Sequence, residues 1–357
     1  MKIAFRVDAS DQIGTGHLVR CLTLASALKL HGARTRIISR EMPSYLQKMV
    51  TEGDHEFAPL NNEKKELPLK NQEYSNWLGV NQLTDAQHSL QVLSDEMWDW
   101  IVVDHYALNS HWESSLRQIS KKILVIDDIA NRQHDCNVLL DQNFYTDAET
   151  RYIGKVPDDC QLLLGPRYAL LREEFRQLRK QINRHNLKIK RVLVFFGGID
   201  KDNLTSITMS ALENIRIEGL HVDVVIGSHH PHHDAIKSAC AKYQFDCHVQ
   251  TTHMADLTAA ADLAIGAGGS ANWERCCLGL PAVIVSVADN QTEIAKSLSM
   301  IGAVHYIGFK DIASTAVIQK AILDLINNSN QVASLSEKSY SLVDGLGTDR
   351  LCRVMGY

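Results

Sequence analysis

The sequence has no excess of basic residues, no apolar run of membrane length and no C-x-x-C cysteine pair. Its 37 lysines and arginines are outnumbered by 42 aspartates and glutamates, which gives a net charge of -5. This balance disfavours nucleic acids and anionic membranes as partners, because both require many phosphates to be neutralised. The absence of long apolar runs disfavours membrane insertion. The strand-like start at Met1 does not resemble a signal peptide, so we expect a cytoplasmic protein.

The eight cysteines are expected to be reduced and mostly buried. Cys276 and Cys277 are adjacent within an apolar stretch, which is a poor geometry for zinc. Four histidines gather around one proline at residues 229–233, where we expect a solvated loop, although adventitious metal binding by this cluster stays open. The sequence therefore predicts no metal site and no cofactor.

Short apolar runs alternate with helical stretches along the chain, a pattern typical of parallel sheets covered by helices. A length of 357 residues also favours two domains. Charged and amide residues dominate the stretch 172–190, which we interpret as a helix and linker. Strands are expected at residues 2–7, 35–39, 100–103, 123–126, 138–140 and 161–164, and again at 191–196, 222–226, 247–250, 263–265 and 282–285.

We therefore predict an α/β protein with two Rossmann-like, doubly wound lobes of the GT-B kind and an interdomain cleft. The N-terminal lobe is expected at residues 1–170 and the C-terminal lobe at 191–345, joined by the helix and linker at 171–190. The stretch 316–340 is expected to be helical, and residues 346–357 to dock back on the body. Ligands of such sheets bind at the carboxyl ends of the strands, so site residues are expected there.

The first candidate loop follows the first expected strand and contains Gly14 and Gly16. It does not match a dinucleotide fingerprint, because Val19 stands where the third glycine belongs, and it lacks the lysine of a phosphate loop. His17 is expected in the first turn of a helix, whose positive end favours a neutral imidazole. A neutral imidazole can act as a general base. The alternative is that His17 only caps or packs the helix start.

The second candidate loop, with Gly266, Gly268 and Gly269, joins a buried strand to a helix that starts near Ser270. Backbone N–H groups and the helix dipole there suit a diphosphate without lysine or metal. Glu274, about one turn into the helix, suits the two hydroxyls of a ribose. The alternative is a plain strand–turn–helix connection in which Glu274 is solvated.

Polar residues also follow other expected strands. Asn290 and Gln291 suit the hydroxyl or acetamido groups of a sugar, although a residue such as Asn290 also suits the cap of the next helix. In the first lobe, Asp104 and the pair Asp127 and Asp128 stand at strand ends. Carboxylate pairs can bind Mg²⁺, but we favour capping roles for these aspartates.

At these motifs the chain resembles the UDP-2,4-diacetamido-2,4,6-trideoxy-β-L-altropyranose hydrolases of pseudaminic acid biosynthesis. The second lobe is also similar to the GT-B glycosyltransferase that adds N-acetylglucosamine to lipid I. The segments that carry the resemblance follow the family's order along nearly the whole chain: residues 6–10, 14–17 with Arg20, 104–106, 127–132, 139–143, 165–172, 196–200, 268–274 and 289–291.

The resemblance implies metal-independent hydrolysis of the UDP-sugar, with attack of water on the anomeric carbon, inversion, and His17 as the base. A monomer is expected for a two-lobe enzyme that must open and close, and the expected partner is the UDP-sugar. Two other functions stay open, a glycosyltransferase of the same plan and a nucleotide-sugar-binding protein without chemistry. The implied substrate-binding residues are Arg6, Asp8, Gly14, Gly16, Tyr106, Asn290 and Gln291, and the implied UDP-binding residues are Met254, Gly268, Gly269, Ser270 and Glu274.

Overall fold

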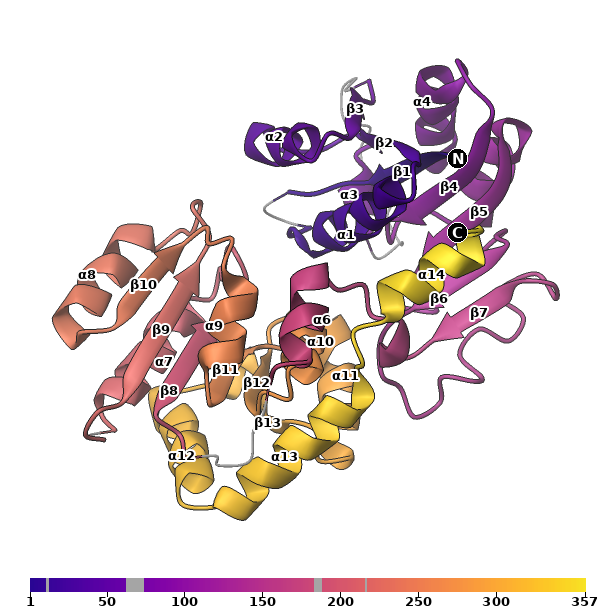
Figure 1. Cartoon of the computed structure of the whole chain (residues 1–357). Helices are drawn as coiled ribbons and strands as arrows, with labels where there is room; N and C mark the ends of the chain where they lie inside the picture. Colours follow the sequence, from indigo (N-terminus) through magenta and orange to yellow (C-terminus); the bar gives the residue numbers. More distant parts are fainter. Residues whose placement is uncertain (11–12, 62–73, 183–187, 216) are drawn as a thin grey trace. The chain divides into compact units, whose positions relative to one another are not determined.

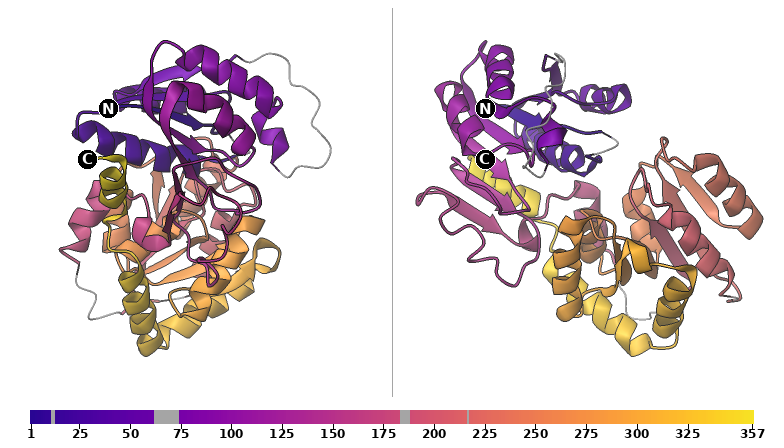
Figure 2. Two further views of the ribbon diagram at one scale, coloured as in Figure 1. Left: turned by 90° about the vertical axis from the view of Figure 1, so that its right-hand side faces the viewer. Right: turned by 180° about the vertical axis from the view of Figure 1, so that it is seen from behind.

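The computed structural model describes residues 1–10, 13–61, 74–182, 188–215 and 217–357 (Figure 1). The chain divides into two compact units. Unit 1 comprises residues 1–143, 147–170 and 347–357, and unit 2 comprises residues 144–146 and 171–346. Each unit contains one parallel sheet flanked by helices (Figure 2). Among the helices that the structure describes, none has both the length and the apolar character needed to cross a bilayer.

The sheet of unit 1 has seven strands in the order β3-β2-β1-β4-β5-β6-β7, and all neighbouring pairs are parallel. The order reverses at β1 and β4, so the carboxyl ends of these two strands form the switch point, with Val7 opposite Asp104. The strands are β1 (Lys2–Val7), β2 (Arg34–Ser39), β3 (Glu56–Pro59), β4 (Trp98–Asp104), β5 (Ser120–Ile126), β6 (Val138–Asp141) and β7 (Gln161–Leu164).

Helices cover both faces of this sheet. Because the side chains of a strand alternate between the two faces, neighbouring residues of β1 pack against different helices. Phe5 of β1 belongs to the apolar cluster with α1, α2 and α14, and the adjacent Ala4 belongs to the cluster with α4 and α5. The last helix is fixed by its packing on α1 and by Trp100, whose indole N–H donates to the carbonyl of Met355 at 3.1 Å. The helices are α1 (Gly16–Leu30), α2 (Ser44–Glu52), α3 (Ser75–Leu78), α4 (Gln82–Leu93), α5 (Ser110–Leu116) and α14 (Gly347–Met355).

The sheet of unit 2 has six parallel strands in the order β10-β9-β8-β11-β12-β13, with the switch point at β8 and β11. Its strands are β8 (Arg191–Phe195), β9 (His221–Ile226), β10 (Asp246–Val249), β11 (Leu263–Ala267), β12 (Ala282–Ser286) and β13 (His305–Phe309). Its helices are α6 (Glu173–Arg179), α7 (Leu204–Glu213), α8 (His233–Tyr243), α9 (Met254–Ala260), α10 (Ala271–Cys277), α11 (Asp289–Met300), α12 (Thr315–Ile326) and α13 (Ser329–Leu342).

The predicted fold class of two doubly wound α/β units is confirmed, and a strand lies at every expected position. The sequence missed β3 and β13, whose residues are only partly buried and show no clear apolar run. The helix expected at 316–340 is two helices, because the side chain of Asn328 accepts the N–H of Gln331 and starts α13 anew. Most of the polar stretch at 61–76, namely residues 62–73, lies outside the described part.

Candidate active site and nucleotide site

His17 lies at the switch point of unit 1, as the second residue of α1. Its Nδ1 is 2.6 Å from Oδ1 of Asp104, the last residue of β4. An ionised carboxylate can only accept, so Nδ1 carries the proton and the lone pair of the neutral ring is on Nε2. The sequence argument relied on the helix dipole for a neutral ring. The structure adds a carboxylate that fixes the tautomer and the ring orientation.

Arg20 holds Asp104 in place from the next turn of α1. Its Nε donates to Oδ2 of Asp104 and its Nη2 to Oδ1, both at 2.6 Å, while Nη1 donates to both carboxylate oxygens of Asp128 at 3.0 Å. Burial opposes ionisation of Asp104, but the charge of Arg20 and the hydrogen bonds from Arg20 and His17 outweigh it and hold the pKa of Asp104 well below its usual range. Asp104 and Asp128 are thus members of an ion-pair network, a role that the sequence analysis did not anticipate.

Aromatic rings surround His17. The ring of Tyr106 meets the imidazole edge-on with the centroids 4.7 Å apart, and its hydroxyl donates to Asp128 at 2.7 Å. Trp77 stacks on Tyr106 at 5.5 Å, and Tyr74 lies 5.1 Å from the same ring. The sequence analysis missed Tyr74 and Trp77, because they lie in a polar segment without apolar periodicity.

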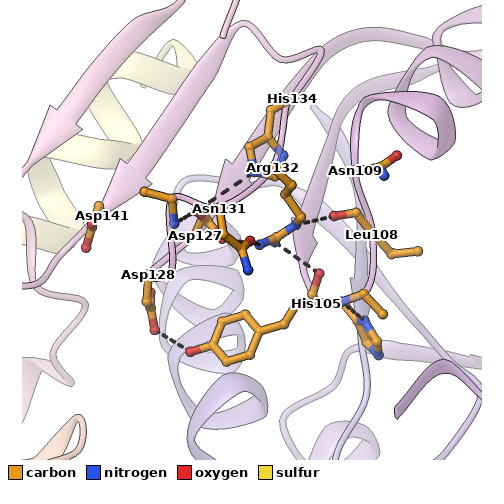
Figure 3. A network of polar contacts seen from close by, with 12 residues as sticks. His105, Leu108, Asn109, Asp127, Asp128, Asn131, Arg132, His134 and Asp141 are labelled. Atoms are coloured by element: carbon orange, nitrogen blue, oxygen red, sulfur yellow. Dashed lines mark hydrogen bonds and ion pairs between the residues drawn. The ribbon is translucent and has the colours of Figure 1, made fainter. Parts of the chain in front are cut away.

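A second polar network shapes the loop after β5 (Figure 3). Asp127 accepts the N–H of Ala130 at 2.8 Å and pairs with Arg132 at 2.8 Å, so this aspartate does cap a turn, as expected. His134 binds Glu113 through Nδ1 at 2.7 Å. Burial would lower the pKa of His134, but Asp127 and Glu113 raise it to about 9. The loop is therefore held by a buried charged histidine.

Arg6 lies near the carboxyl end of β1 and Asp8 directly follows this strand, and both side chains are buried. The guanidinium of Arg6 binds both Asp8, at 2.5 and 2.9 Å, and Asp85, at 2.8 and 3.0 Å. Asp8 also accepts from the hydroxyl of Ser39 and the N–H of Arg40, each at 2.8 Å. With no exposed surface and with these hydrogen bonds in place, Arg6 and Asp8 fit a positioning role better than the direct substrate contact that the resemblance implies.

The first glycine loop leads directly into α1. Gly14 has a φ of +82°, which L side chains rarely adopt, and its N–H donates to the carbonyl of Ser10 at 2.7 Å. Gly16 is the first residue of α1, immediately before His17. The two glycines therefore form the turn that brings His17 to the carboxyl end of β1.

The second glycine loop follows β11 in unit 2. The N–H of Gly268 donates to the carbonyl of Val285 at 3.2 Å, which leaves the N–H groups of Gly269 and Ser270 as the candidates for phosphate. Ser270 is exposed at the start of α10 and makes no side-chain cap. Because α10 has only seven residues, the dipole that the sequence analysis invoked is weaker than that of a long helix.

Gln291 lies against this loop. A Cβ on Gly268 would be 3.4 Å from Cβ of Gln291, and one on Gly269 would be 3.5 Å from its amide nitrogen. The amide oxygen of Gln291 accepts the N–H of Val287 at 3.1 Å, which directs the amide nitrogen to the loop. The N-cap of α11 is Ala288, without a side-chain hydrogen bond, so the capping alternative for Asn290 is wrong.

Met254 and Glu274 line one small cavity of unit 2, of about 10 Å³. That volume is room for about one water, so a uracil ring does not fit inside it. The Glu274 side chain is 19% exposed, and Nη2 of Arg172 lies 3.5 Å from it. Burial raises the pKa of Glu274, which Arg172 partly offsets. Glu274 is therefore partly buried and close to Arg172 rather than fully solvated. The cavity is also lined by Leu193, Phe195, Thr258, Ala264, Ile265, Ala271 and Arg275.

The histidine cluster at residues 229–233 is not entirely a solvated loop. His230 is buried, with Nε2 3.6 Å from Asp200, whereas His229 is exposed. Elsewhere in the described residues, ligand atoms of His221, Asp223 and Asp246 lie within 4.8 Å of one another at the amino ends of β9 and β10. Both carboxylate oxygens of the buried Asp223 already accept hydrogen bonds from Arg191, and one of them also contacts His248.

Comparisons with known proteins identify similar sequences and folds. Residues 191–345 match the glycosyltransferase family 28 C-terminal domain. The chain is 29% identical over 226 residues to the UDP-2,4-diacetamido-2,4,6-trideoxy-β-L-altropyranose hydrolase of Campylobacter jejuni, covering 61% of this chain and 68% of that protein. It is 23% identical to the spore coat polysaccharide biosynthesis protein SpsG of Bacillus subtilis, covering 99% and 98%. It spans 57% of the uncharacterized protein MJ1062 of Methanocaldococcus jannaschii, at 22% identity over 82% of this chain.

Solved structures share the fold at low sequence identity. MurG of Acinetobacter baumannii superposes with a TM-score of 0.66 at 14% identity over 99% of both chains. A UGT transferase of Siraitia grosvenorii gives 0.61 at 12% identity over 100% of both chains. Residues 191–345 thus match a glycosyltransferase family 28 C-terminal domain within a GT-B-like fold, and the resemblance of the chain to the UDP-2,4-diacetamido-2,4,6-trideoxy-β-L-altropyranose hydrolases is confirmed.

Proposed function

We propose that this protein hydrolyses UDP-2,4-diacetamido-2,4,6-trideoxy-β-L-altropyranose to UDP and the free sugar, as a cytoplasmic monomer in pseudaminic acid biosynthesis. The observation that carries the proposal is the 2.6 Å contact between Nδ1 of His17 and Asp104 at the switch point of unit 1. It leaves Nε2 as a base for water. The similarity to the Campylobacter jejuni hydrolase supports the choice of substrate.

In the proposed reaction, Nε2 of His17 takes a proton from water while the water oxygen attacks the anomeric carbon. The bond from this carbon to the UDP oxygen breaks with its electron pair on UDP, so the configuration inverts. Asp104 stabilises the imidazolium that forms and keeps the ring oriented, as the carboxylate does in a catalytic triad. Arg20 in turn fixes Asp104. Turnover therefore depends on a histidine whose tautomer is set before substrate binds.

We assign the binding roles from the resemblance together with the described contacts. UDP is a good leaving group, so the reaction needs preorganised donors for the diphosphate more than a general acid. We assign the diphosphate to the loop of Gly268, Gly269 and Ser270, with the N–H groups of the last two as donors. Glu274 is assigned to the ribose and Met254 to the side of the uracil.

The sugar contacts are assigned to Tyr106 in unit 1 and to Asn290 and Gln291 in unit 2. Arg6 and Asp8 are assigned a positioning role at the end of β1.

The test is turnover of the UDP-sugar in ¹⁸O-water with EDTA, followed by mass analysis of both products. Label in the free sugar and none in UDP is the expected result, since it reports cleavage of the bond to the anomeric carbon. Label in the phosphate of UDP would mean P–O cleavage and would overturn the mechanism.

A glycosyltransferase is the second candidate, because residues 191–345 match a glycosyltransferase family domain. The same assay separates the two functions when it contains no acceptor. Rapid release of UDP supports the hydrolase, whereas release only after an acceptor is added supports the transferase. Binding of the UDP-sugar without any turnover would show a binding protein.

A further inference from the structure

Arg275 on α10 is a buried cation whose hydrogen bonds go only to neutral groups. The residue is 5% exposed. Its Nη2 donates to the carbonyl of Ala267 at 2.6 Å and to Oδ1 of Asn272 at 2.5 Å. Its Nε has no hydrogen-bond partner, and within the described residues no carboxylate forms an ion pair with it. An isolated buried charge is unfavourable unless something compensates it.

Other buried arginines of this chain are compensated. Arg6 binds two carboxylates in unit 1, and Arg20 does the same. In unit 2, the partly exposed Arg191 also pairs with a carboxylate, that of Asp223, at 2.6 Å. Burial lowers the pKa of Arg275, to about 10, with only a partial offset from neighbouring groups such as Glu274. The guanidinium therefore still carries its charge at neutral pH, without a bound counter-charge.

Gly266 makes the room that this guanidinium occupies. A Cβ at Gly266 would lie 2.8 Å from Nη1 of Arg275 and 2.1 Å from the carbonyl oxygen of Phe195. The φ of Gly266 is not positive, so no turn requires a glycine here. The close approach of strand and guanidinium is what requires it.

Arg275 and Asn272 also orient the glycine loop. Arg275 holds the carbonyl of Ala267, and the side-chain amide of Asn272 donates to the carbonyl of Gly268 at 2.9 Å. In a trans peptide the N–H points opposite to the carbonyl. With the Gly268 carbonyl directed at Asn272, the N–H of Gly269 points the other way, toward the open side of the loop.

We propose that Arg275 is the positive charge that complements the diphosphate of the bound nucleotide, and that it acts through the loop of residues 267–270 that it holds. This inference rests on the proposed assignment of UDP to that loop. As the bond to the sugar breaks, negative charge builds up on UDP, and a fixed cation behind the loop stabilises it without reorganisation. Arg275 is a positioning residue here, because it does not touch the reacting atoms.

The experiment is calorimetric titration of the full chain with UDP and with uridine, which lacks the charged group. Arg275→Met is expected to weaken UDP binding by about tenfold or more, because a buried unit charge acts through a low effective dielectric. Uridine affinity is expected to stay unchanged. Arg275→Lys keeps a charge and is expected to retain much of the preference for UDP over uridine.

Two further variants keep the test decisive if Arg275→Met does not fold. Asn272→Asp places a carboxylate beside Nη2, so it neutralises the cation and is expected to lower UDP affinity more than uridine affinity. Arg191→Met is the matched control, since it removes a paired arginine of the same unit and is expected to leave both affinities unchanged.

Equal losses for UDP and uridine in Arg275→Met and Asn272→Asp would show a structural role and overturn the inference. So would unchanged UDP affinity in folded Arg275→Met. If the wild-type chain bound neither ligand, the assignment of UDP to this loop would itself fail, and that outcome is distinct from the first two.

Discussion

The two units treat charge at their switch points in opposite ways. In unit 1, Arg6 and Arg20 each bind two aspartates, so these buried charges form closed networks, and the network of Arg20 holds Asp104 against His17. In unit 2, the glycine loop is lined by neutral groups and by Arg275, which has no carboxylate partner among the described residues. A closed network fixes geometry, whereas an unbalanced charge favours an anionic ligand.

This difference matches the roles proposed for the two units. A general base needs one tautomer in one orientation, and many simultaneous hydrogen bonds provide that. A diphosphate site needs donors and positive potential that no internal group already uses. Variants in unit 1 should therefore change turnover, and variants in unit 2 should change nucleotide binding.

The largest effect is expected from His17→Asn. Loss of a general base typically costs about 10²–10⁴ in rate, so turnover should fall on that scale while UDP affinity stays normal. Steady-state kinetics and calorimetry measure the two quantities. His111→Asn, on the exposed side of α5, is the control. Near-normal turnover of His17→Asn would contradict the base assignment.

Asp104→Asn is expected to lower turnover by about 10²–10³, because an amide can donate to Nδ1 and place the ring proton on Nε2. The double variant with His17→Asn should be no slower than His17→Asn alone, since both changes remove one function. Additive losses in the double variant would show that Asp104 acts independently of His17.

The second polar network of unit 1, which contains Asp127 and His134, should also appear in the pH dependence of stability. His134 has a pKa of about 9 in the folded protein against about 6.5 when unfolded. Its stabilisation is therefore fully present below pH 6.5 and is lost as pH rises through 9, by roughly 2–3 kcal/mol. Denaturant unfolding of wild type and His134→Gln between pH 6 and 10 measures it. A pH slope that is equal in both proteins would refute this origin.

In unit 2, two glycine variants test whether the close packing at Gly266 contributes to stability. Gly266→Ala is expected to destabilise the protein by about 2 kcal/mol, because its Cβ overlaps the carbonyl of Phe195. Gly268→Ala places its Cβ at 3.4 Å from its neighbours and should melt close to wild type. Thermal unfolding of both variants is the measurement, and an equal loss in both would contradict the close approach at Gly266.

The smallest effect is expected from Glu274→Gln. Loss of the carboxylate should weaken UDP binding by about tenfold, because charged acceptors bind hydroxyls more strongly than amides do. A UDP analogue without the ribose hydroxyls should bind wild type and variant equally. If the variant lost affinity for that analogue as well, Glu274 would be acting on the cavity rather than on the ribose.

Much of the fold could be predicted because its signals are local. Apolar runs located β1, β4, β5 and β11, and the glycines marked the turns that follow β1 and β11. The strands β3 and β13 escaped because their residues are only partly buried and have no clear apolar pattern. The break between α12 and α13 escaped because a single capping asparagine decides it.

By itself, the sequence determined two doubly wound sheets, a histidine after β1 and a glycine loop before Glu274, since each depends on neighbours within a few residues. Only the tertiary structure decided what these residues contact. Asp104 meets His17 across 87 residues because β4 lies beside β1, and Trp77 reaches the same ring from α3. Likewise, only the tertiary structure decided that no carboxylate of the described residues pairs with Arg275, because strand order rather than chain order decides which charges meet.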